Sequence, residues 1–309
     1  MKIALLMGGH SREREVSIKS GKAVELGLKK KGHEVDVYEI SDSQLPLWKE
    51  RPQIVFLALH GGSGENGEVQ KELEKRGIPY TGSPPRACKL SMDKVLSKTF
   101  FQKAGLSTPN YSLITPYWQK DVIASLAKSF IGYPCILKPV SEGSSIGVFK
   151  VEGEKELLEI LPKAFEISSE ILMEKYIEGR EFTVAILDEK TLPIIEVRSP
   201  GKFFDYDAKY ASQETQYILD PQVSEVVKKK LERNALLAHS ILGCRHFSRV
   251  DMILDSKDQV HILEINTLPG MTAKSLLPMA AQKAGINFPD LCEQMALMAW
   301  KNKKLRKAG

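Results

Sequence analysis

The chain has 309 residues, 42% of them hydrophobic and 27% charged, which is enough apolar material for two or three folded domains and excludes wholesale disorder. Its net charge is +5, and the terminal segment 301–309 alone carries five basic residues and no acidic one. A solvated basic tail on a neutral body argues against a nucleic-acid partner. The apolar runs are too short to cross a bilayer and the N-terminus lacks a secretory pattern, so we expect a cytoplasmic protein without a membrane partner.

The first 83 residues alternate strand and helix patterns. Residues 2–7 predict a buried strand that ends at a glycine pair, and a helical pattern follows to about residue 31. The apolar run 54–59 predicts a further strand that is buried on both faces and also ends in glycines. This βαβ alternation predicts a parallel sheet with helices on both faces, so we assign residues 1–83 to an N-terminal α/β domain.

A glycine- and proline-bearing segment, residues 81–85, predicts a linker to a second unit. Residues 92–105 then follow a helical pattern. The elements expected after this helix are strands at 135–140, 146–151 and 170–177 and a helix near 154–166. We assign residues 84–177 to a central domain.

Residues 178–309 predict a C-terminal domain. The stretch 202–217 is polar and aromatic without periodicity, which predicts a loop, and a long helix follows at 221–242 with Asp220 as N-cap and Pro221 as its first residue. The expected strands are 181–188, 192–197, 247–254 and 259–265.

The last predicted hairpin carries the strongest polar constellation. Side chains alternate along a strand, so Arg249 and Asp251 share a face, as do Glu264 and Asn266. A two-residue turn would pair residue i with residue 513 − i, which places all four side chains on one face. A shift of the register by two residues keeps them on that face. Carboxylate and amide oxygens suit Mg²⁺ bound together with substrate phosphates. The alternative is the polar outer face of an antiparallel sheet.

A second constellation is the segment KPVSEGSSIG, residues 138–147, in which Lys138 leaves a strand and enters a loop of glycines and serines. Backbone N–H groups and hydroxyls in such loops surround phosphate oxygens. The segment matches neither a Walker A motif nor a Rossmann fingerprint, because no helix follows it. A flexible hairpin loop is the alternative.

A third constellation lies where the first and third predicted strands end. Ser11 can cap the helix that follows and Glu13 lies in its first turn, which is the structural interpretation. The functional interpretation is a ligand site, because open α/β sheets bind ligands at the carboxyl ends of their strands. His60 follows the 54–59 strand at the same edge and is a candidate site residue, although a lone histidine is more often structural.

Seven segments, in this order, resemble the D-alanine–D-alanine ligase family. They are GGHSREREVS (8–17), ALHGGSGENG (58–67), SMDK (91–94), KPVSEGSSIG (138–147), MEKYIEGREFTVAIL (173–187), FFDYDAKYASQETQY (203–217) and RVDMIL…EINTLPGMTAKSL (249–276). The resemblance implies an α/β, three-domain ATP-grasp architecture with an N-terminal parallel-sheet domain. It implies ATP-dependent joining of two D-alanines through a D-alanyl phosphate for peptidoglycan synthesis, two Mg²⁺ or Mn²⁺ ions and a homodimer.

The resemblance also implies roles for individual residues. The nucleotide contacts are Lys94, Lys138 and Lys209 on the phosphates, the last from a lid formed by residues 202–217, with Glu174 and Ile177 at the adenine and Glu181 at the ribose. The metal ligands are Asp251, Glu264 and Asn266. The groups around the amino acids are Glu13, Ser144 and Tyr210 as a hydrogen-bonded set, Arg249 and the Gly270 N–H as oxyanion hole, and His60, Ser275 and Leu276 as substrate contacts.

Two other functions stay open. A related ligase could join D-alanine to D-lactate or D-serine, although by resemblance the depsipeptide-forming members carry a histidine where this chain has Tyr210. A non-catalytic ATP-binding sensor could keep the fold, although the metal ligands and Glu13 are all retained. ATP turnover with each candidate amino acid would separate these functions.

Overall fold

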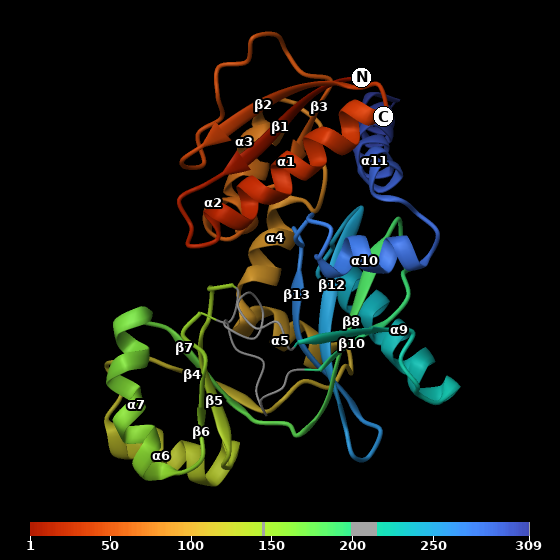
Figure 1. Cartoon of the computed structure of the whole chain (residues 1–309). Helices are drawn as coiled ribbons and strands as arrows, with labels where there is room; N and C mark the ends of the chain where they lie inside the picture. The colour runs from red at the N-terminus through yellow and green to blue at the C-terminus, as the bar shows by residue number, and fades with distance from the viewer. Residues whose placement is uncertain (144–145, 199–214, 309) are drawn as a thin grey trace.

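The computed structural model describes residues 1–143, 146–198 and 215–308, with side chains as far as Lys301. It contains three sheets, with strand orders β2-β1-β3, β4-β7-β5-β6 and β11-β10-β8-β12-β13, and β9 pairs with β8 beside the third path. The first sheet is parallel, and the strands of the other two pair antiparallel. Figure 1 shows the first sheet at one end of the molecule and the other two facing each other at the opposite end.

The N-terminal sheet confirms the predicted βαβ alternation. Its elements are β1 (Lys2–Gly8), α1 (Arg14–Lys30), β2 (Glu34–Ile40), β3 (Ile54–Leu57), α2 (Gly62–Glu65) and α3 (Glu68–Lys75). The prediction of strand through residue 59 was wrong, because β3 ends at Leu57 and the chain then turns into the glycine loop. The helix begins later than predicted, because Glu13 takes the position before α1 and makes no side-chain cap. The Ser11 hydroxyl accepts from the Glu13 N–H at 3.2 Å and donates to the His60 carbonyl at 2.6 Å.

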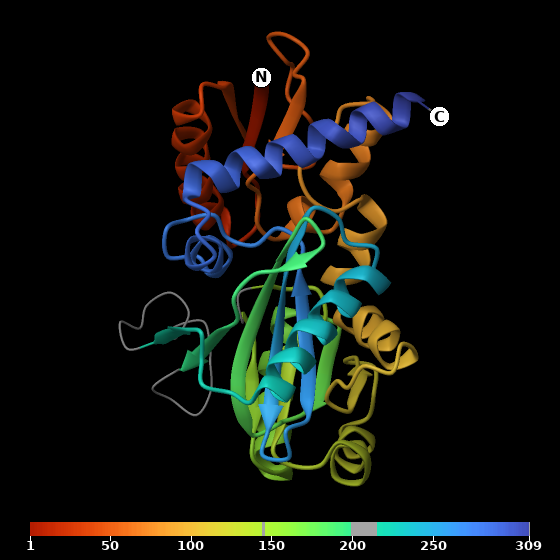
Figure 2. The same cartoon turned by 90° about the vertical axis from the view of Figure 1, so that its right-hand side faces the viewer.

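The last helix of the chain packs on the first sheet. Helix α11 (Phe288–Ala308) lies beside α1 and β3, and Figure 2 shows it crossing this end of the molecule. Cys292 and Met295 are fully buried in the same apolar core as Val24 and Leu28 of α1. The core of the N-terminal part is therefore completed by residues that lie more than 250 positions later in the sequence.

The central part carries an antiparallel sheet with helices packed on it. Its elements are α4 (Pro85–Met92), α5 (Lys94–Lys103), β4 (Tyr111–Ile114), α6 (Lys120–Leu126), the π-helical turn η1 (Ala127–Ile131), β5 (Cys135–Pro139), β6 (Phe149–Val151), α7 (Glu154–Ile167) and β7 (Ile171–Lys175). The helix predicted at 92–105 is preceded by the separate helix α4. The two are divided at Asp93, whose side chain caps α5 by accepting from the Leu96 N–H at 2.9 Å.

In the part of the chain that carries the third sheet, the strands lie close to their predicted positions, but the helix does not. Its elements are β8 (Gly179–Leu187), β9 (Lys190–Thr191), β10 (Ile195–Arg198), β11 (Gln216–Leu219), α9 (Glu225–Ile241), β12 (Phe247–Asp255), β13 (Val260–Asn266) and α10 (Leu276–Lys283). The helix predicted from residue 221 begins at Glu225. Asp220 adopts a left-handed φ of 63° and cannot cap it, and Ser224 accepts from the Val227 N–H instead. Of the predicted loop, residues 216–217 belong to β11 and residues 202–214 lie outside the described residues.

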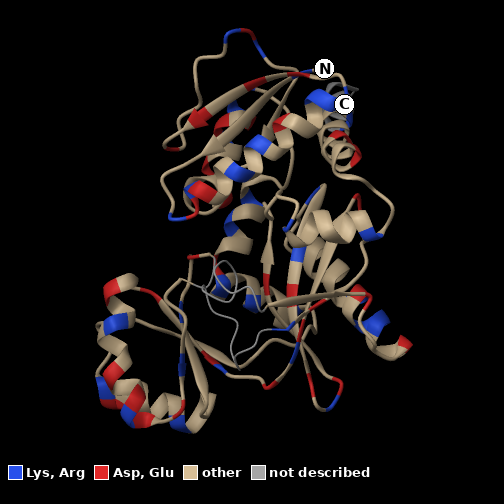
Figure 3. Ribbon diagram, in the orientation of Figure 1, with Lys and Arg blue, Asp and Glu red and all other residues tan. Residues whose placement is uncertain are grey.

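Charged residues of both signs are interspersed along the outer helix α7, as Figure 3 shows. Among the helices that the structure describes, none combines the length and the apolar character needed to span a membrane.

Candidate active site

The strand pair β12–β13 places four polar side chains together by means of a bulge. From Met252 onward the strands pair residue i with residue 514 − i, one residue away from the predicted register, which alone would turn Asp251 away from Glu264. A bulge between Asp251 and Met252 shifts the register by one more residue. Asp251 therefore lies opposite Glu264, and Arg249 lies opposite Asn266. The predicted shared face is confirmed although the predicted pairing was wrong.

The Asp251 carboxylate accepts four hydrogen bonds. Arg249 donates to it from Nε and Nη2 at 2.9 and 2.7 Å, which forms a two-pronged ion pair. The Thr183 hydroxyl of β8 donates at 2.7 Å and the Asn266 amide at 3.1 Å. These donors orient both oxygens of a buried carboxylate and leave the amide oxygen of Asn266 as a further possible ligand.

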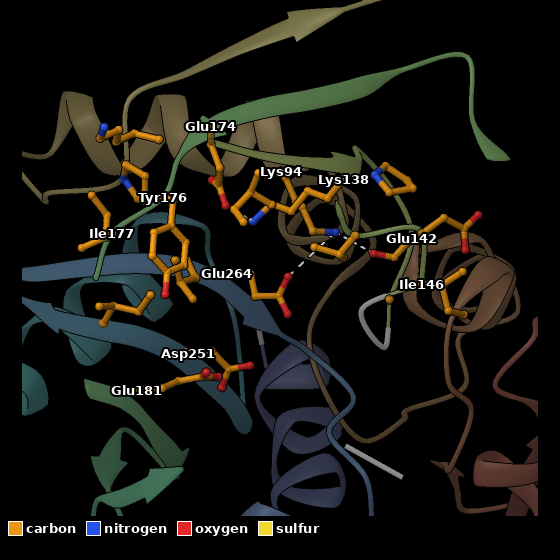
Figure 4. Close-up of a pocket in the computed structure, with 18 of the residues that line it drawn as sticks. Lys94, Lys138, Glu142, Ile146, Glu174, Tyr176, Ile177, Glu181, Asp251 and Glu264 are labelled. Atoms are coloured by element: carbon orange, nitrogen blue, oxygen red, sulfur yellow. Dashed lines mark hydrogen bonds and ion pairs between the residues drawn. The ribbon is translucent and has the colours of Figure 1, made fainter. Parts of the chain in front are cut away.

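A cavity lies between this sheet and the central sheet. Its walls include Lys94, Lys138 and Glu174 on the central side and Glu181, Asp251 and Glu264 on the other, and Figure 4 shows these side chains around it. Lys94 spans the two sides, because its Nζ donates to the Glu142 carbonyl at 2.6 Å and lies 3.8 Å from the Glu264 carboxylate. The cavity therefore joins cationic groups and carboxylates from different parts of the chain.

The central wall is built on a buried ion-pair cluster. Glu174, on β7, is paired through one oxygen with Lys138 of β5 and through the other with Lys98 of α5 at 2.8 Å. Burial alone would raise the pKa of Glu174, but Lys138 and Lys98 together hold it below its ordinary value. Sequence reasoning missed Lys98. The available signal was its spacing of four residues from Lys94, which places both lysines on one side of the same helix.

Two further residues that were predicted to contact the nucleotide lie at the same cavity. Ile177 and Glu181 line it, at the connection from β7 into β8 and on β8 itself. The lining also has an apolar part from both sheets, which includes Ile136 and Leu263. Apolar side chains next to a few convergent charged groups are typical of a ligand pocket, and they suit a base attached to phosphates.

Glu13 lies where three loops meet. A Cβ atom placed on Gly61 would lie 2.8 Å from the Glu13 Oε2, and one placed on Gly143 would lie 2.6 Å from it. Both positions therefore exclude a side chain while Glu13 occupies this place. The structure brings together the loop after β1, the loop after β3 and the loop that follows Lys138. The residues Ser144, Lys209 and Tyr210 lie outside the described residues.

His60 is buried between the N-terminal sheet and the loop after β13. Its Nδ1 lies 2.9 Å from the Leu268 carbonyl and its Nε2 lies 3.0 Å from the Ser20 hydroxyl. Ser20 also accepts from the Met271 N–H at 3.1 Å. Burial, followed by the charge of Arg249, lowers the pKa of His60 to about 4, so the imidazole is neutral at physiological pH. The Nδ1 atom contacts the C-terminal loop directly, and the Nε2 atom contacts Ser20, which in turn accepts from that loop.

The other predicted substrate residues follow in the same loop. A Cβ atom on Gly270 would lie 2.7 Å from the Ser275 hydroxyl, so these two residues are in close contact. The Ser275 Oγ accepts from the Thr272 N–H at 3.0 Å and Ser275 precedes α10, whose first residue is Leu276. The Leu276 N–H is thus at a helix N-terminus, where backbone groups favour an anion.

Glu65 is a second residue that sequence reasoning did not single out. It accepts from the Gly61 N–H at 2.8 Å and lines a smaller cavity together with Lys94, Glu264 and Asn266. Burial and the nearby charge of Glu13 raise its pKa to about 8. The signal was an acidic residue within a glycine-rich loop at the carboxyl end of a strand, which the motif ALHGGSGENG contained.

Solved structures share this architecture over nearly the full chain. A D-alanine–D-alanine ligase from Bacillus anthracis complexed with ATP is 35% identical, covers 99% of each chain and superposes with a TM-score of 0.85. The VanG D-Ala:D-Ser ligase from Enterococcus faecalis is 26% identical, with coverage of 96% of this chain and 99% of that chain and a TM-score of 0.85. Together with the lysine and carboxylate walls, this similarity defines the chain as an ATP-grasp protein.

Sequence comparison identifies the family within the ATP-grasp class to which the chain belongs. A family model described as D-ala D-ala ligase C-terminus matches residues 100–297. A D-alanine–D-alanine ligase from Marinomonas sp. is 42% identical over 306 residues, which covers 96% of this chain and 95% of the relative. The chain belongs to the D-alanine–D-alanine ligase family.

Proposed function

We propose that this chain uses ATP to join two D-alanine molecules into D-alanyl-D-alanine, with ADP and phosphate as the other products, for the synthesis of peptidoglycan precursors. The observation that carries the proposal is the cavity with lysines on one wall and carboxylates on the other, in a chain 42% identical to a D-alanine–D-alanine ligase. We further propose three domains, residues 1–83, 84–177 and 178–309. The separate sheet in each part supports this division, with α11 returning to the first.

The proposed nucleotide site uses the central wall and β8. Lys94 and Lys138 contact the phosphates of ATP, for which their buried ammonium groups are suited. Ile177 lines the adenine pocket, and Glu181 accepts from the ribose hydroxyls. Glu174 belongs to the same wall, and its carboxylate is already engaged by two lysines. We therefore assign the contact with adenine to the backbone next to Glu174 and not to its carboxylate.

The metal site is proposed on the opposite wall. Within the described residues no cluster of three or more His, Cys, Asp or Glu side chains could form a complete protein cage for a metal. The donor set of Asp251, Glu264 and Asn266 supplies a few hard oxygens, which fits Mg²⁺ or Mn²⁺ that completes its coordination with water and phosphate oxygens. Two such ions bound here would neutralise charge on the phosphates of ATP.

The reaction follows from the remaining groups. Glu13 binds the ammonium of the first D-alanine, and the carboxylate of that D-alanine attacks the γ-phosphorus while ADP leaves. The product of this step is D-alanyl phosphate. Lys94 and Lys138 hold the phosphates in position and stabilise their charge during the transfer.

The second step forms the peptide bond. The deprotonated amine of a second D-alanine, whose carboxylate is held by Ser275 and the Leu276 N–H, attacks the acyl carbon. Arg249 and the Gly270 N–H stabilise the oxyanion, and phosphate leaves as the tetrahedral intermediate collapses. His60 acts here through the loop that it binds, because its Nδ1 contacts the Leu268 carbonyl, two residues before Gly270.

The test is product analysis with purified protein, ATP, Mg²⁺ and D-alanine, followed by mass spectrometry. D-alanyl-D-alanine and equimolar ADP support the proposal, and ATP binding without turnover would support a sensor instead. D-serine is also tested as the second substrate, because a D-Ala:D-Ser ligase shares the fold at a TM-score of 0.85. A chain that forms D-alanyl-D-serine or D-alanyl-D-lactate in preference to D-alanyl-D-alanine would contradict the substrate assignment.

We also propose that the protein acts in the cytoplasm, where ATP is supplied, and that it forms a homodimer. Apolar side chains at the packed pair α1 and α11 support the dimer, since Leu26 is 71% exposed and Leu297 is 38% exposed. Sedimentation of the wild type and of Leu26→Glu tests it. A wild-type monomer at micromolar concentration would contradict the dimer.

A further inference from the structure

Lys98 is a fully buried lysine with no role in the chemistry described above. None of its surface is exposed, and its Nζ lies 2.8 Å from the Glu174 carboxylate and donates to the Thr108 hydroxyl at 2.7 Å. A buried ammonium is costly unless it is paired and hydrogen-bonded, and Lys98 is both. A leucine or methionine would fill this place on α5 at a lower desolvation free energy, so the presence of a charge here needs an explanation.

The contacts of Lys98 reach both walls of the nucleotide cavity. On one side, the Glu174 carboxylate lies between Lys98 and Lys138 and pairs with both, so the two lysines share one carboxylate. On the other side, Thr108 donates to the Ile262 carbonyl of β13 at 2.8 Å, and the Ile262 N–H donates to the Ser107 carbonyl at 2.8 Å. Strand β13 carries Glu264 of the opposite wall. One buried ammonium thereby connects α5, β7 and β13.

We propose that Lys98 is a positioning residue for nucleotide binding, which acts through Glu174 to hold Lys138 at the phosphates and through Thr108 to fix the spacing of the two walls. This inference rests on the proposed function, since it assumes that Lys138 contacts ATP. One carboxylate shared by two lysines leaves an excess positive charge in a buried cluster. An arriving phosphate compensates this charge, so the cluster attracts the nucleotide and presents Lys138 in one orientation.

The charge on Lys98 depends on its surroundings. Burial lowers the pKa of Lys98 to about 8, against the raising effect of Glu174, while Lys138 adds to the lowering. The charged or titratable groups that face Lys98 are Glu174, Lys138, Glu264 and the Tyr111 ring. Lys98 therefore loses its proton as pH rises through about 8, whereas an exposed lysine keeps its proton there.

The test is ADP binding with Mg²⁺ by calorimetry, in wild type, Lys98→Met, Thr108→Val and two matched controls. Thr108→Ser keeps the hydroxyl, and Lys103→Met removes an exposed lysine from the end of the same helix. We expect Lys98→Met to weaken binding by about tenfold and Thr108→Val by about threefold, with both controls near wild type. Wild-type affinity falls between pH 7.5 and 9.5, and this fall is absent in Lys98→Met.

A double-mutant cycle with Glu174→Gln separates positioning from general stability. If Lys98 acts through Glu174 as well as Thr108, Lys98→Met weakens ADP binding in the Glu174→Gln background by only about the threefold expected for Thr108→Val, and not by the full tenfold. Equal ADP affinity in wild type, Lys98→Met and Thr108→Val would overturn the inference, and so would additive losses in the cycle. If Lys98→Met does not fold, Thr108→Val against Thr108→Ser decides, and equal binding by these two overturns it. A wild-type protein that does not bind ADP would instead refute the proposed function.

Discussion

The two walls of the nucleotide cavity hold their charges in different ways. On the central wall a single carboxylate, Glu174, is shared by Lys98 and Lys138, so positive charge is in excess. On the opposite wall Asp251 is surrounded by donors, while Glu264 has Lys94 at 3.8 Å. The cationic groups of the first wall suit the direct contact with phosphates proposed above. The second presents oriented oxygens whose negative charge suits metal ions between protein and phosphate.

The largest expected effect comes from the carboxylate wall. Glu264→Gln removes the charge of a proposed metal ligand, so phosphate release from ATP with D-alanine should fall more than about a hundredfold. The matched control is Asp258→Asn, an exposed acid in the turn of the same hairpin, which should retain full activity. Thermal unfolding of both variants checks the fold. Near-normal turnover by folded Glu264→Gln would remove Glu264 from the metal site.

The lysine wall is tested by Lys138→Met. Because Lys138 is proposed to contact the phosphates, the KM for ATP should rise roughly ten- to a hundredfold, with a smaller effect on the KM for D-alanine. Steady-state kinetics with each substrate varied measures the difference. Lys155→Met, an exposed position on α7, is the control. Equal increases in both KM values would show that this wall is not specific to the nucleotide.

The junction of the N-terminal loop with the central loop gives a smaller expected effect. Gly143→Ala places a Cβ atom 2.6 Å from the Glu13 carboxylate, so Glu13 is displaced from the proposed ammonium site. We expect kcat/KM for D-alanine to fall about tenfold while the KM for ATP changes little. In Gly153→Ala the new Cβ atom meets no atom within 4 Å, which makes it the control. Wild-type kinetics in Gly143→Ala would contradict the placement of Glu13.

The smallest effect concerns the pH dependence of stability. The pKa of Glu65 is raised to about 8, so the folded protein retains a proton that the unfolded chain loses above about pH 4.5. Folding stability attributable to Glu65 therefore decreases as pH rises from about 4.5 to 8 and is constant above that range. Glu65→Gln should remove this decrease, so the stability of the variant relative to wild type should grow as pH rises from about 4.5 to 8. Urea unfolding at several pH values measures it, and parallel curves for both proteins would contradict the raised pKa.

Local patterns were sufficient to predict the parallel N-terminal sheet and the common face of Asp251 and Glu264. The pairing of that hairpin was mispredicted because a bulge changes the register without any clear signal in the sequence. The helix start moved from Asp220 to Ser224 because Asp220 takes a left-handed conformation. Propensity alone does not reveal such a turn.

Contacts between distant segments were beyond sequence reasoning. The return of α11 to the N-terminal core, the sharing of Glu174 by two lysines and the contact of Glu13 with Gly143 all depend on tertiary packing. Lys98 and Glu65 were missed for the same reason, since burial and neighbouring charges distinguish them from ordinary surface residues.

We propose that the two walls together transfer the γ-phosphoryl group of ATP to the carboxylate of D-alanine. The most direct measurement uses D-alanine labelled with ¹⁸O in its carboxylate, with ATP and Mg²⁺, and mass analysis of the released phosphate. Attack of the carboxylate on the γ-phosphorus predicts that one labelled oxygen appears in phosphate for each dipeptide formed. Dipeptide formation with unlabelled phosphate would contradict an acyl phosphate intermediate and the proposed role of the two walls.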